Sequence, residues 1–319
     1  MIHSARRVIS LILCLACLSA CSTVSVVPAR TEATPRLAVI SAFDAELDKL
    51  RAAAQVSEVR VINGRSHYVG RLGGHDVVLL LSGFSMVNAA MTTQALFDHF
   101  QVQGVIFSGI AGGVNPGLRV GDVTVPAQWG NYQEQAFARE TPDGWDPGRF
   151  TGDFKNFGMM FPRAASVVVS GGEPDKLERR FWFPADVSAL AAARQVSAKV
   201  RLSRCSAAGD CLEHEPRVVV GGNGVSGPTF VDNAAYRTWA WDTFKADALD
   251  METAAVALVA YVNRVPYIAF RSLSDLAGGG PGKNEGKTFG KLAADNSAAV
   301  VIEYLRTLPA GQTGSTAPR

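Results

Sequence analysis

Three carboxylic acids stand close to the ends of predicted buried strands, where an acid can reach a ligand bound at the edge of a sheet. Glu46 follows the apolar run 37–42 by a few positions, and Asp275 lies just past the apolar run 267–270. Glu252 opens a predicted helix directly after another short strand. Positioned carboxyl groups deprotonate water or donate a proton to a leaving group. Taken by themselves, these positions are most simply those of solvated or helix-capping acids, with general acid–base chemistry as the alternative.

The elements that must position these acids alternate along the chain. We expect strands at residues 37–42, 59–62, 66–70, 76–81, 105–107, 121–125, 217–220, 247–249 and 267–270. We expect helices from about residue 44 and at 86–100, 187–198, 232–244, 251–262 and 286–305. The alternation predicts an α/β fold, in which one three-layer domain has a twisted, mixed but mostly parallel central sheet flanked by helices. Such sheets bind ligands at the carboxyl ends of their strands.

Four segments depart from this alternation. Residues 108–113 are expected to form a glycine-rich turn, and residues 128–184 a long, partly irregular insertion rich in Trp, Phe, Gly and Pro. The segment 21–36 is small, polar and Pro-containing, which is typical of a flexible tether. The tail 309–319 lacks periodicity and is expected to be disordered, which leaves 37–308 as the folded domain.

Composition excludes several classes of protein. The chain has 319 residues, 47% of them apolar and 19% charged, which rules out a disordered chain, a collagen-like chain and a small disulfide scaffold. The formal net charge is +2, so no strongly basic surface is implied and we expect no nucleic acid as a partner.

The N-terminus is predicted to direct export. Residues 1–20 form a short basic segment followed by a brief apolar run, as in a secretory signal peptide, and the run is too short to span a bilayer. Its end, LSAC at 18–21, resembles the lipobox of bacterial lipoproteins, in which the cysteine is acylated. We therefore expect Cys21 to carry a lipid anchor, with an ordinary cleaved signal as the alternative. By the sorting rule of Gram-negative lipoproteins, Ser22 favours the periplasmic face of the outer membrane.

Two further cysteines lie close together in the body of the chain. Cys205 and Cys211 are six positions apart, and in an exported protein this spacing most simply indicates a disulfide that closes a small loop. A metal site would recruit His214 as a third ligand, but no fourth ligand stands nearby. We therefore expect a structural bridge and no metal.

Four ordered segments carry a family resemblance. They are Ile40–Glu46 (ISAFDAE), Ser82–Ala90 (SGFSMVNAA), Ser108–Gly113 (SGIAGG), and Asp250–Glu252 (DME) continuing to Arg271–Asp275 (RSLSD). In this order they resemble the nucleoside phosphorylase/nucleosidase superfamily, most of all the methylthioadenosine/adenosylhomocysteine nucleosidases and related plant storage-type proteins. The resemblance covers about residues 37–306 and implies a nucleoside phosphorylase-like fold. The aromatic insertion and the cysteine loop depart from the family pattern.

The resemblance assigns the catalytic residues. Glu46 matches the Glu that activates water, and Asp275 matches the Asp that protonates or hydrogen-bonds N7 of a leaving purine. This role favours a purine substrate, since a pyrimidine has no N7. Arg271 is expected to hydrogen-bond the water or Glu46, with a structural ion pair as the alternative.

The resemblance also implies substrate-binding residues. Met251 would pack on the sugar, while Glu252 would accept hydrogen bonds from its hydroxyls and strengthen them in the transition state. Phe230 and Val231 are expected to contact the base, and Ser82 and Gly83 to line the region of the ribose and the water. Ser274 is expected to contact the substrate beside Asp275.

Three activities are left to distinguish. Phosphorylases of this superfamily bind phosphate with Arg and hydroxyl groups, whereas this chain has Glu46 in its first loop and apolar Ile110 in its glycine-rich segment. We therefore expect hydrolysis of a purine nucleoside to base and ribose, with phosphorolysis as the first alternative. A nucleoside-binding lipoprotein without turnover is the second alternative.

No metal or organic cofactor is implied, and family members often close their pocket with a neighbouring subunit, so we expect a homo-oligomer. The residues leave open which purine nucleoside binds and what its 5′ substituent is.

Overall fold

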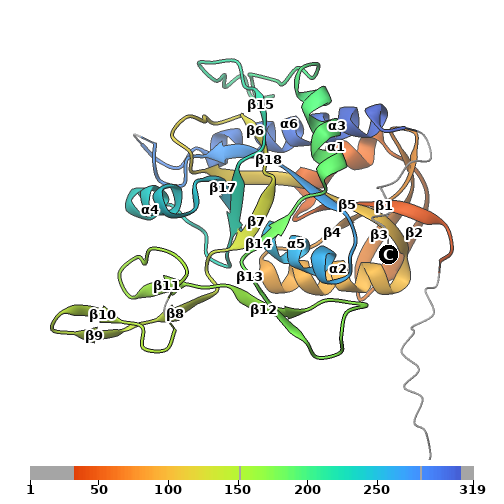
Figure 1. The fold of residues 1–319 in the computed structure, drawn as a ribbon. Helices are drawn as coiled ribbons and strands as arrows, with labels where there is room; N and C mark the ends of the chain where they lie inside the picture. The colour runs from red at the N-terminus through yellow and green to blue at the C-terminus, as the bar shows by residue number, and fades with distance from the viewer. Residues whose placement is uncertain (1–31, 151, 281, 310–319) are drawn as a thin grey trace, which may run out of the picture.

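The computed structural model describes residues 32–150, 152–280 and 282–309 (Figure 1). The predicted signal peptide, Cys21 and the segment 310–319 lie outside the described residues. The first strand begins at Pro35, two residues before the end of the segment predicted as a tether, 21–36.

A central sheet of twelve strands organises the described residues. Its main path is β14 (Trp182–Pro184), β7 (Gln128–Asn131), β16 (Asn223–Ser226), β17 (Ala246–Asp250), β5 (Gln101–Gly113), β1 (Pro35–Ser41), β4 (His75–Leu81), β3 (Arg65–Leu72) and β2 (Gln55–Ile62). Off this path lie β6 (Val123–Val125), β15 (Val218–Val220) and β18 (Tyr267–Asp275). The strands β1, β4, β5 and β18 run parallel to one another, while β2, β3 and β17 join antiparallel. The sheet is therefore mixed around a parallel centre, as predicted.

Six helices complete the layers of the described part of the chain. They are α1 (Asp44–Ala53), α2 (Met86–His99), α3 (Val187–Ser197), α4 (Ala234–Phe244), α5 (Thr253–Val262) and α6 (Gly286–Thr307). Figure 1 shows α1, α3 and α6 above the sheet and α2 and α5 below it. Helix α6 packs on β18 and β5, and α2 packs on α5. This three-layer α/β architecture confirms the predicted fold class.

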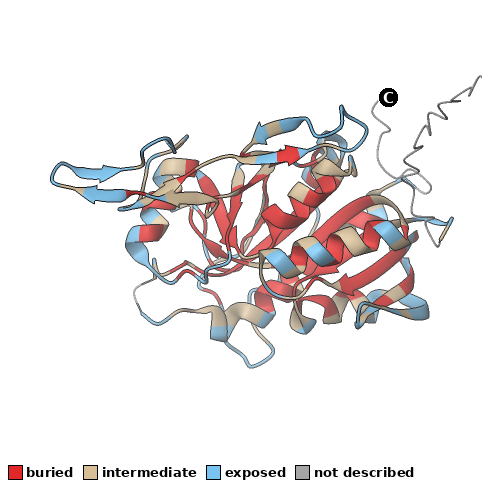
Figure 2. Cartoon of the chain, turned by 90° about the horizontal axis from the view of Figure 1, so that it is seen from below, coloured by how far each residue is buried: buried red, intermediate tan, exposed pale blue. Residues whose placement is uncertain are grey.

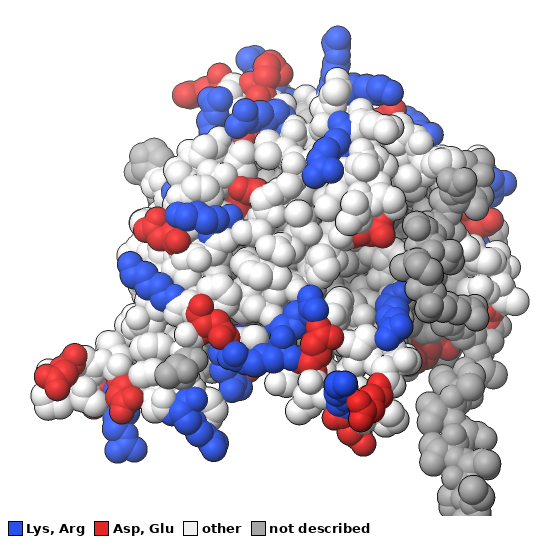
Figure 3. All heavy atoms as spheres, viewed as in Figure 1, with Lys and Arg blue, Asp and Glu red and all other residues white. Residues whose placement is uncertain are grey.

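The central strands are apolar because both of their faces are covered. All nine residues of β18 are buried, and Figure 2 shows buried strands lying between partly exposed helices. None of the described helices is both long and apolar enough to cross a membrane. On the face seen in Figure 3, basic and acidic side chains are interspersed around the margins of the molecule.

The insertion is shorter than predicted. The two ends of the predicted range 128–184 are strands β7 and β14 of the central sheet. Their residues Trp129 and Phe183 are buried in the core, so these ends belong to the main body and not to the insertion. Between them lie three antiparallel pairs: β8 (Gln135–Phe137) with β11 (Met160–Pro162), β9 (Arg139–Thr141) with β10 (Gly144–Asp146), and β12 (Ala165–Val168) with β13 (Leu177–Arg180). The hairpin of β9 and β10 projects from the body with exposed residues (Figure 2).

The glycine-rich segment is not a turn, which corrects the prediction for 108–113. Strand β5 continues through it to Gly113 and pairs with β18 along this length. Glycine fits this part of the strand because side chains of neighbouring elements occupy the space that a Cβ would need.

Two neighbouring elements also differ from the expected boundaries. Strand β18 extends to Asp275, so this acid is the last residue of the strand. Helix α5 begins at Thr253, so Glu252 is its N-cap residue and does not lie in its first turn.

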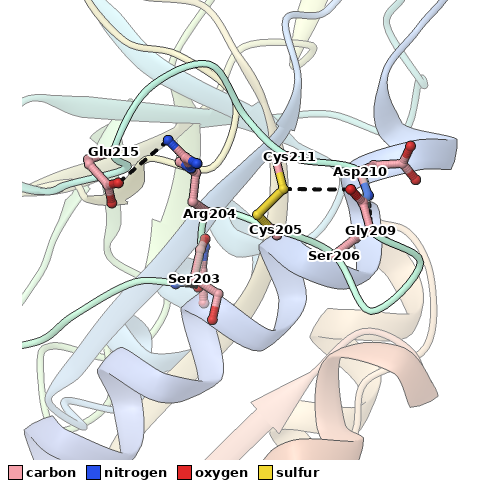
Figure 4. The surroundings of a disulfide bond; sticks show 9 residues. Ser203, Arg204, Cys205, Ser206, Gly209, Asp210, Cys211 and Glu215 are labelled. Atoms are coloured by element: carbon pink, nitrogen blue, oxygen red, sulfur yellow. Dashed lines mark hydrogen bonds and ion pairs between the residues drawn. A yellow bond between two sulfur atoms is a disulfide. The ribbon is translucent and has the colours of Figure 1, made fainter.

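Cys205 and Cys211 are joined by a disulfide that closes an exposed loop (Figure 4). The connection holding this loop is fastened to α6, since Ser203 and the buried Asn296 exchange two hydrogen bonds at 2.8 and 2.9 Å. Within the described ranges, no group of three or more His, Cys, Asp or Glu residues is arranged to hold a metal ion.

Candidate active site

A completely buried guanidinium lies at the centre of the site. Arg271, on β18, is 0% exposed, and its guanidinium carbon lies 4.1 Å from the centre of the Phe107 ring. Three carboxylates surround it: Asp250 at 2.7 Å from Nε, Glu46 at 3.6 Å from Nη1 and Glu252 at 3.8 Å from Nη2. One cation thus faces three acids that are far apart in the sequence.

Glu46 is held by backbone groups from two strand ends. It lies in the first turn of α1, and its Oε2 accepts a hydrogen bond from the Ala42 amide at 2.7 Å. Its Oε1 accepts a second from the Ile110 amide, also at 2.7 Å. Burial raises the pKa of Glu46, while Arg271 and the two amides oppose that shift. The carboxylate is therefore oriented and desolvated, as a general base requires.

Glu252 joins α5 to the loop before α2. Its Oε1 accepts a hydrogen bond from the Ser85 amide at 2.6 Å, and Ser85 has a φ of 75°, which is unusual for a residue with a Cβ. Burial, followed by the negative charge of Asp250, raises the pKa of Glu252 to about 7. The group therefore changes its charge near neutral pH.

Asp275 is the last residue of β18, beyond Arg271 at the middle of the strand, and lies outside the carboxylate group. It accepts hydrogen bonds from the Ser274 hydroxyl at 2.7 Å and from the Ala277 amide at 2.8 Å. Arg271 pairs with Gly109 and Asp275 with Gly112, so the two lie about 10 Å apart along an extended strand. Within the described residues, no recorded hydrogen bond or ion pair joins Asp275 to Glu46 or Glu252.

The predicted base-binding segment lies against the loop that follows Asp275. Phe230 is 66% exposed, whereas Val231 is buried in an aromatic cluster that also contains Ala277. The Asn233 amide donates a hydrogen bond to the Ala277 carbonyl at 3.0 Å. The segment that carries the exposed Phe230 ring thus lies beside the loop that follows Asp275.

The predicted sugar-side residues lie in the loop that contacts Glu252. The Ser82 amide donates a hydrogen bond to the Ser41 carbonyl at 2.8 Å, and Gly83 has a φ of 77°. Met251 is partly buried beside Glu252. Sequence reasoning therefore placed Glu46, Arg271, Glu252, Ser82 and Gly83 in one neighbourhood, which the structure brings together.

The same loops form an apolar rim. Phe43 and Phe84 stack with their ring centres 5.1 Å apart, and Phe84 is 58% exposed. Ala42, one residue before Phe43, donates its amide to Glu46, and Ser85, one residue after Phe84, donates its amide to Glu252.

Several site residues were missed by sequence reasoning. Asp250 was recognised only as part of the DME motif and was given no role. Its place at the end of a strand, like that of Asp275, could have indicated a site residue. The backbone amides of Ala42, Ile110 and Ser85 carry no signal in residue type, because any amino acid except proline has such an amide.

The chain was compared with known proteins. The model of the Phosphorylase superfamily matches residues 36–306, and the chain therefore belongs to this superfamily. Bark storage protein B from Populus deltoides is 28% identical over 259 residues, covering 78% of this chain and 79% of the relative. A 5′-methylthioadenosine/S-adenosylhomocysteine nucleosidase from Bacillus cytotoxicus is 29% identical over 281 residues, covering 86% and 99%.

Solved structures share the fold. A 5′-methylthioadenosine/S-adenosylhomocysteine nucleosidase from Neisseria meningitidis, in complex with methylthio-immucillin-A, is similar with a TM-score of 0.63 and 26% identity, covering 86% of this chain and 99% of that one. The futalosine hydrolase of Helicobacter pylori has a TM-score of 0.64 at 22% identity, covering 86% and 98%, which shows likeness of fold alone.

Gly109 provides a test of the packing at the centre of the site. A Cβ at this position would overlap Arg271 Nη1 and Glu46 Oε1, whereas a Cβ at Gly104, on the same strand, would meet Leu37 at an ordinary 3.4 Å. We expect Gly109→Ala to lower the free energy of unfolding by about 1–3 kcal/mol, because overpacking displaces a buried ion pair. Gly104→Ala should stay close to wild type in the same chemical denaturation experiment. Equal effects of the two substitutions would contradict this packing.

Proposed function

We propose that this protein hydrolyses the N-glycosidic bond of a purine nucleoside, releasing the base and ribose. The observation that carries the proposal is the buried, backbone-held carboxylate of Glu46, which lies beside an Arg271 guanidinium whose two amino groups have no hydrogen-bond partner among the described residues. A water molecule held between them would lose its proton to Glu46 as it attacks C1′ of the sugar.

The leaving base needs a proton donor on the other side of the scissile bond. As the C1′–N9 bond breaks, its electron pair goes to the purine, and Asp275 would deliver a proton to N7. Glu252 would accept hydrogen bonds from the ribose hydroxyls, which strengthen as the sugar becomes positively charged. Its relatives include proteins named as nucleosidases, which supports this assignment.

The charge balance favours water over phosphate as the nucleophile. Among the described residues, the cation recorded at Glu46, Asp250 and Glu252 is Arg271, already opposed by three carboxylates. A phosphate dianion would add charge of the same sign in a desolvated site, where repulsion is strong. Hydrolysis adds no charge.

Replacing Glu46 tests the proposed base. We expect Glu46→Gln to lower kcat for adenosine, inosine or methylthioadenosine about 10²- to 10⁴-fold, because the amide cannot take a proton from water. Asp44→Asn, in the same helix turn but exposed, is the matched control and should keep wild-type turnover. Chromatography of the products with and without phosphate is the measurement. Ribose 1-phosphate formed only with phosphate would identify a phosphorylase, and binding without turnover a nucleoside-binding protein.

The pKa of Glu252 predicts a pH dependence. Because the pKa is raised to about 7, the ribose-binding carboxylate loses its charge as the pH falls through neutrality. We expect kcat/KM to rise between about pH 6 and 8, with a limb near 7. Glu252→Gln should remove this limb and lower kcat/KM about 10- to 100-fold, the worth of a hydrogen bond to a charged group. An unchanged profile in the variant would exclude Glu252 as its source.

We further propose that the enzyme acts in the cell envelope, anchored by lipid at Cys21. The support is the basic and apolar leader that ends in LSAC at 18–21. Metabolic labelling with tritiated palmitate should mark the wild-type chain and the Cys17→Ser control, in which the substituted cysteine lies within the leader. Cys21→Ser should be unlabelled and leave the membrane fraction. Label retained on that variant would place the acyl group elsewhere.

A further inference from the structure

Asp250 has a fully occupied carboxylate next to the proposed catalytic residues. It ends β17, is 6% exposed, and its Oδ2 accepts hydrogen bonds from Arg271 Nε at 2.7 Å and from the Thr253 hydroxyl. Its Oδ1 accepts from the Ser226 hydroxyl at 2.5 Å and from the amides of Thr253 and Glu252 at 3.1 and 3.2 Å. Five donors from the protein surround two oxygens. Asp250 is therefore committed to the protein and has little capacity left for a substrate.

These contacts determine how Arg271 is oriented. Its Nε donates to both Asp250 and the Thr253 hydroxyl, at 2.7 and 2.9 Å, and the face of its guanidinium lies over Phe107. One edge and one face of the planar group are thus held. The two amino groups face different acids: Nη1 lies beside Glu46 and Nη2 beside Glu252.

The two amino groups have no hydrogen-bond partner in the described part of the chain, although each faces a carboxylate. Both are completely buried and lie 3.6 and 3.8 Å from the acids they face, too far for a direct hydrogen bond. A buried charged donor without a hydrogen bond is energetically costly, more so than a neutral one. A bound ligand or water would complete such donors, and here Nη1 lies beside Glu46 and Nη2 beside Glu252.

We propose that Asp250 is a positioning residue that aims Arg271, keeping both amino groups free to hold the attacking water between Glu46 and the sugar. This inference rests on the proposed nucleosidase function. Asp250 touches neither water nor nucleoside and acts through the guanidinium. When Asp250 has no charge, Arg271 is free to move into a direct hydrogen bond with Glu46 or Glu252. Its amino groups are then occupied by the protein and do not bind water.

Asp250 also affects the pH profile, because its charge acts on the pKa of Glu252. The charged or polar groups that face Glu252 are Asp250 from β17, Arg271 from β18, Glu46 from α1 and the Ser85 amide. Asp250 holds the pKa of Glu252 up, and Arg271 lowers it. Removing the charge of Asp250 should therefore move the acidic limb of kcat/KM to lower pH, since Glu252 then ionises more easily.

The test is Asp250→Asn, which keeps the shape of the side chain and removes its charge. We expect kcat to fall about 10- to 100-fold with KM within about 3-fold of wild type, because orientation of the nucleophile is lost while substrate contacts remain. The acidic limb should move down by about one pH unit. Asp122→Asn is the matched control: Asp122 is 2% exposed, and its carboxylate accepts hydrogen bonds from the amides of Arg119 and Arg217 rather than from Arg271.

A second pair of variants covers failure of Asp250→Asn to fold. Thr253→Val removes the hydroxyl shared by Asp250 and Arg271, and should lower kcat several-fold in the same direction, while Thr253→Ser should restore it. Wild-type kcat and an unmoved limb in Asp250→Asn, or equal losses in Asp122→Asn, would overturn the inference. If the wild-type protein releases no base from any purine nucleoside, the proposed function fails instead, so the two failures are distinguishable.

Discussion

One buried guanidinium holds the candidate site together. Burying an ion is costly unless it is paired, and Arg271 is 0% exposed among the carboxylates of Glu46, Asp250 and Glu252. One positive charge cannot neutralise three negative ones, so the excess must be relieved by protonation. Glu252, whose pKa is raised to about 7, is the acid that takes up a proton near neutral pH and so reduces the excess negative charge. Removing Arg271 would leave three desolvated acids facing one another, and we regard its burial as the constraint from which the remaining arrangement follows.

The scaffold meets this constraint with its longest strand. Strand β5 pairs with β1, β17 and β18. Glu46 lies in the helix that follows β1, Asp250 ends β17, and β18 carries Arg271 at its middle and Asp275 at its end. Its glycine at 109 leaves space in which the Glu46 and Arg271 side chains meet, and its glycine at 112 leaves space for Asp275. The glycines thus serve the site by lacking side chains. A strand of larger residues would keep the pairing and exclude the acids.

The parts that depart from the family pattern lie outside this centre. The hairpins between β7 and β14 extend from the sheet edge, and the disulfide loop of Cys205 and Cys211 lies near α6. The connection carrying that loop does reach the core, because Asn296, which binds Ser203, precedes Ser297, whose hydroxyl accepts from the Gly109 amide at 3.2 Å. The additions are therefore fastened to the scaffold without replacing any of the charged groups.

The amino-acid sequence alone determined the layers of the fold and the acids of the site. Alternating apolar runs predicted the sheet, and ordered motifs identified Glu46, Glu252, Arg271 and Asp275, because these signals lie in residue type and local spacing. It misjudged β5, read as a turn at 108–113, since glycine favours turns unless a distant side chain needs its space. It also assigned no role to Asp250, and it gave no indication that the pKa of Glu252 is raised. Those features were decided by tertiary structure, because desolvation, charge coupling and the aim of a guanidinium arise only when residues more than 200 positions apart are packed against one another.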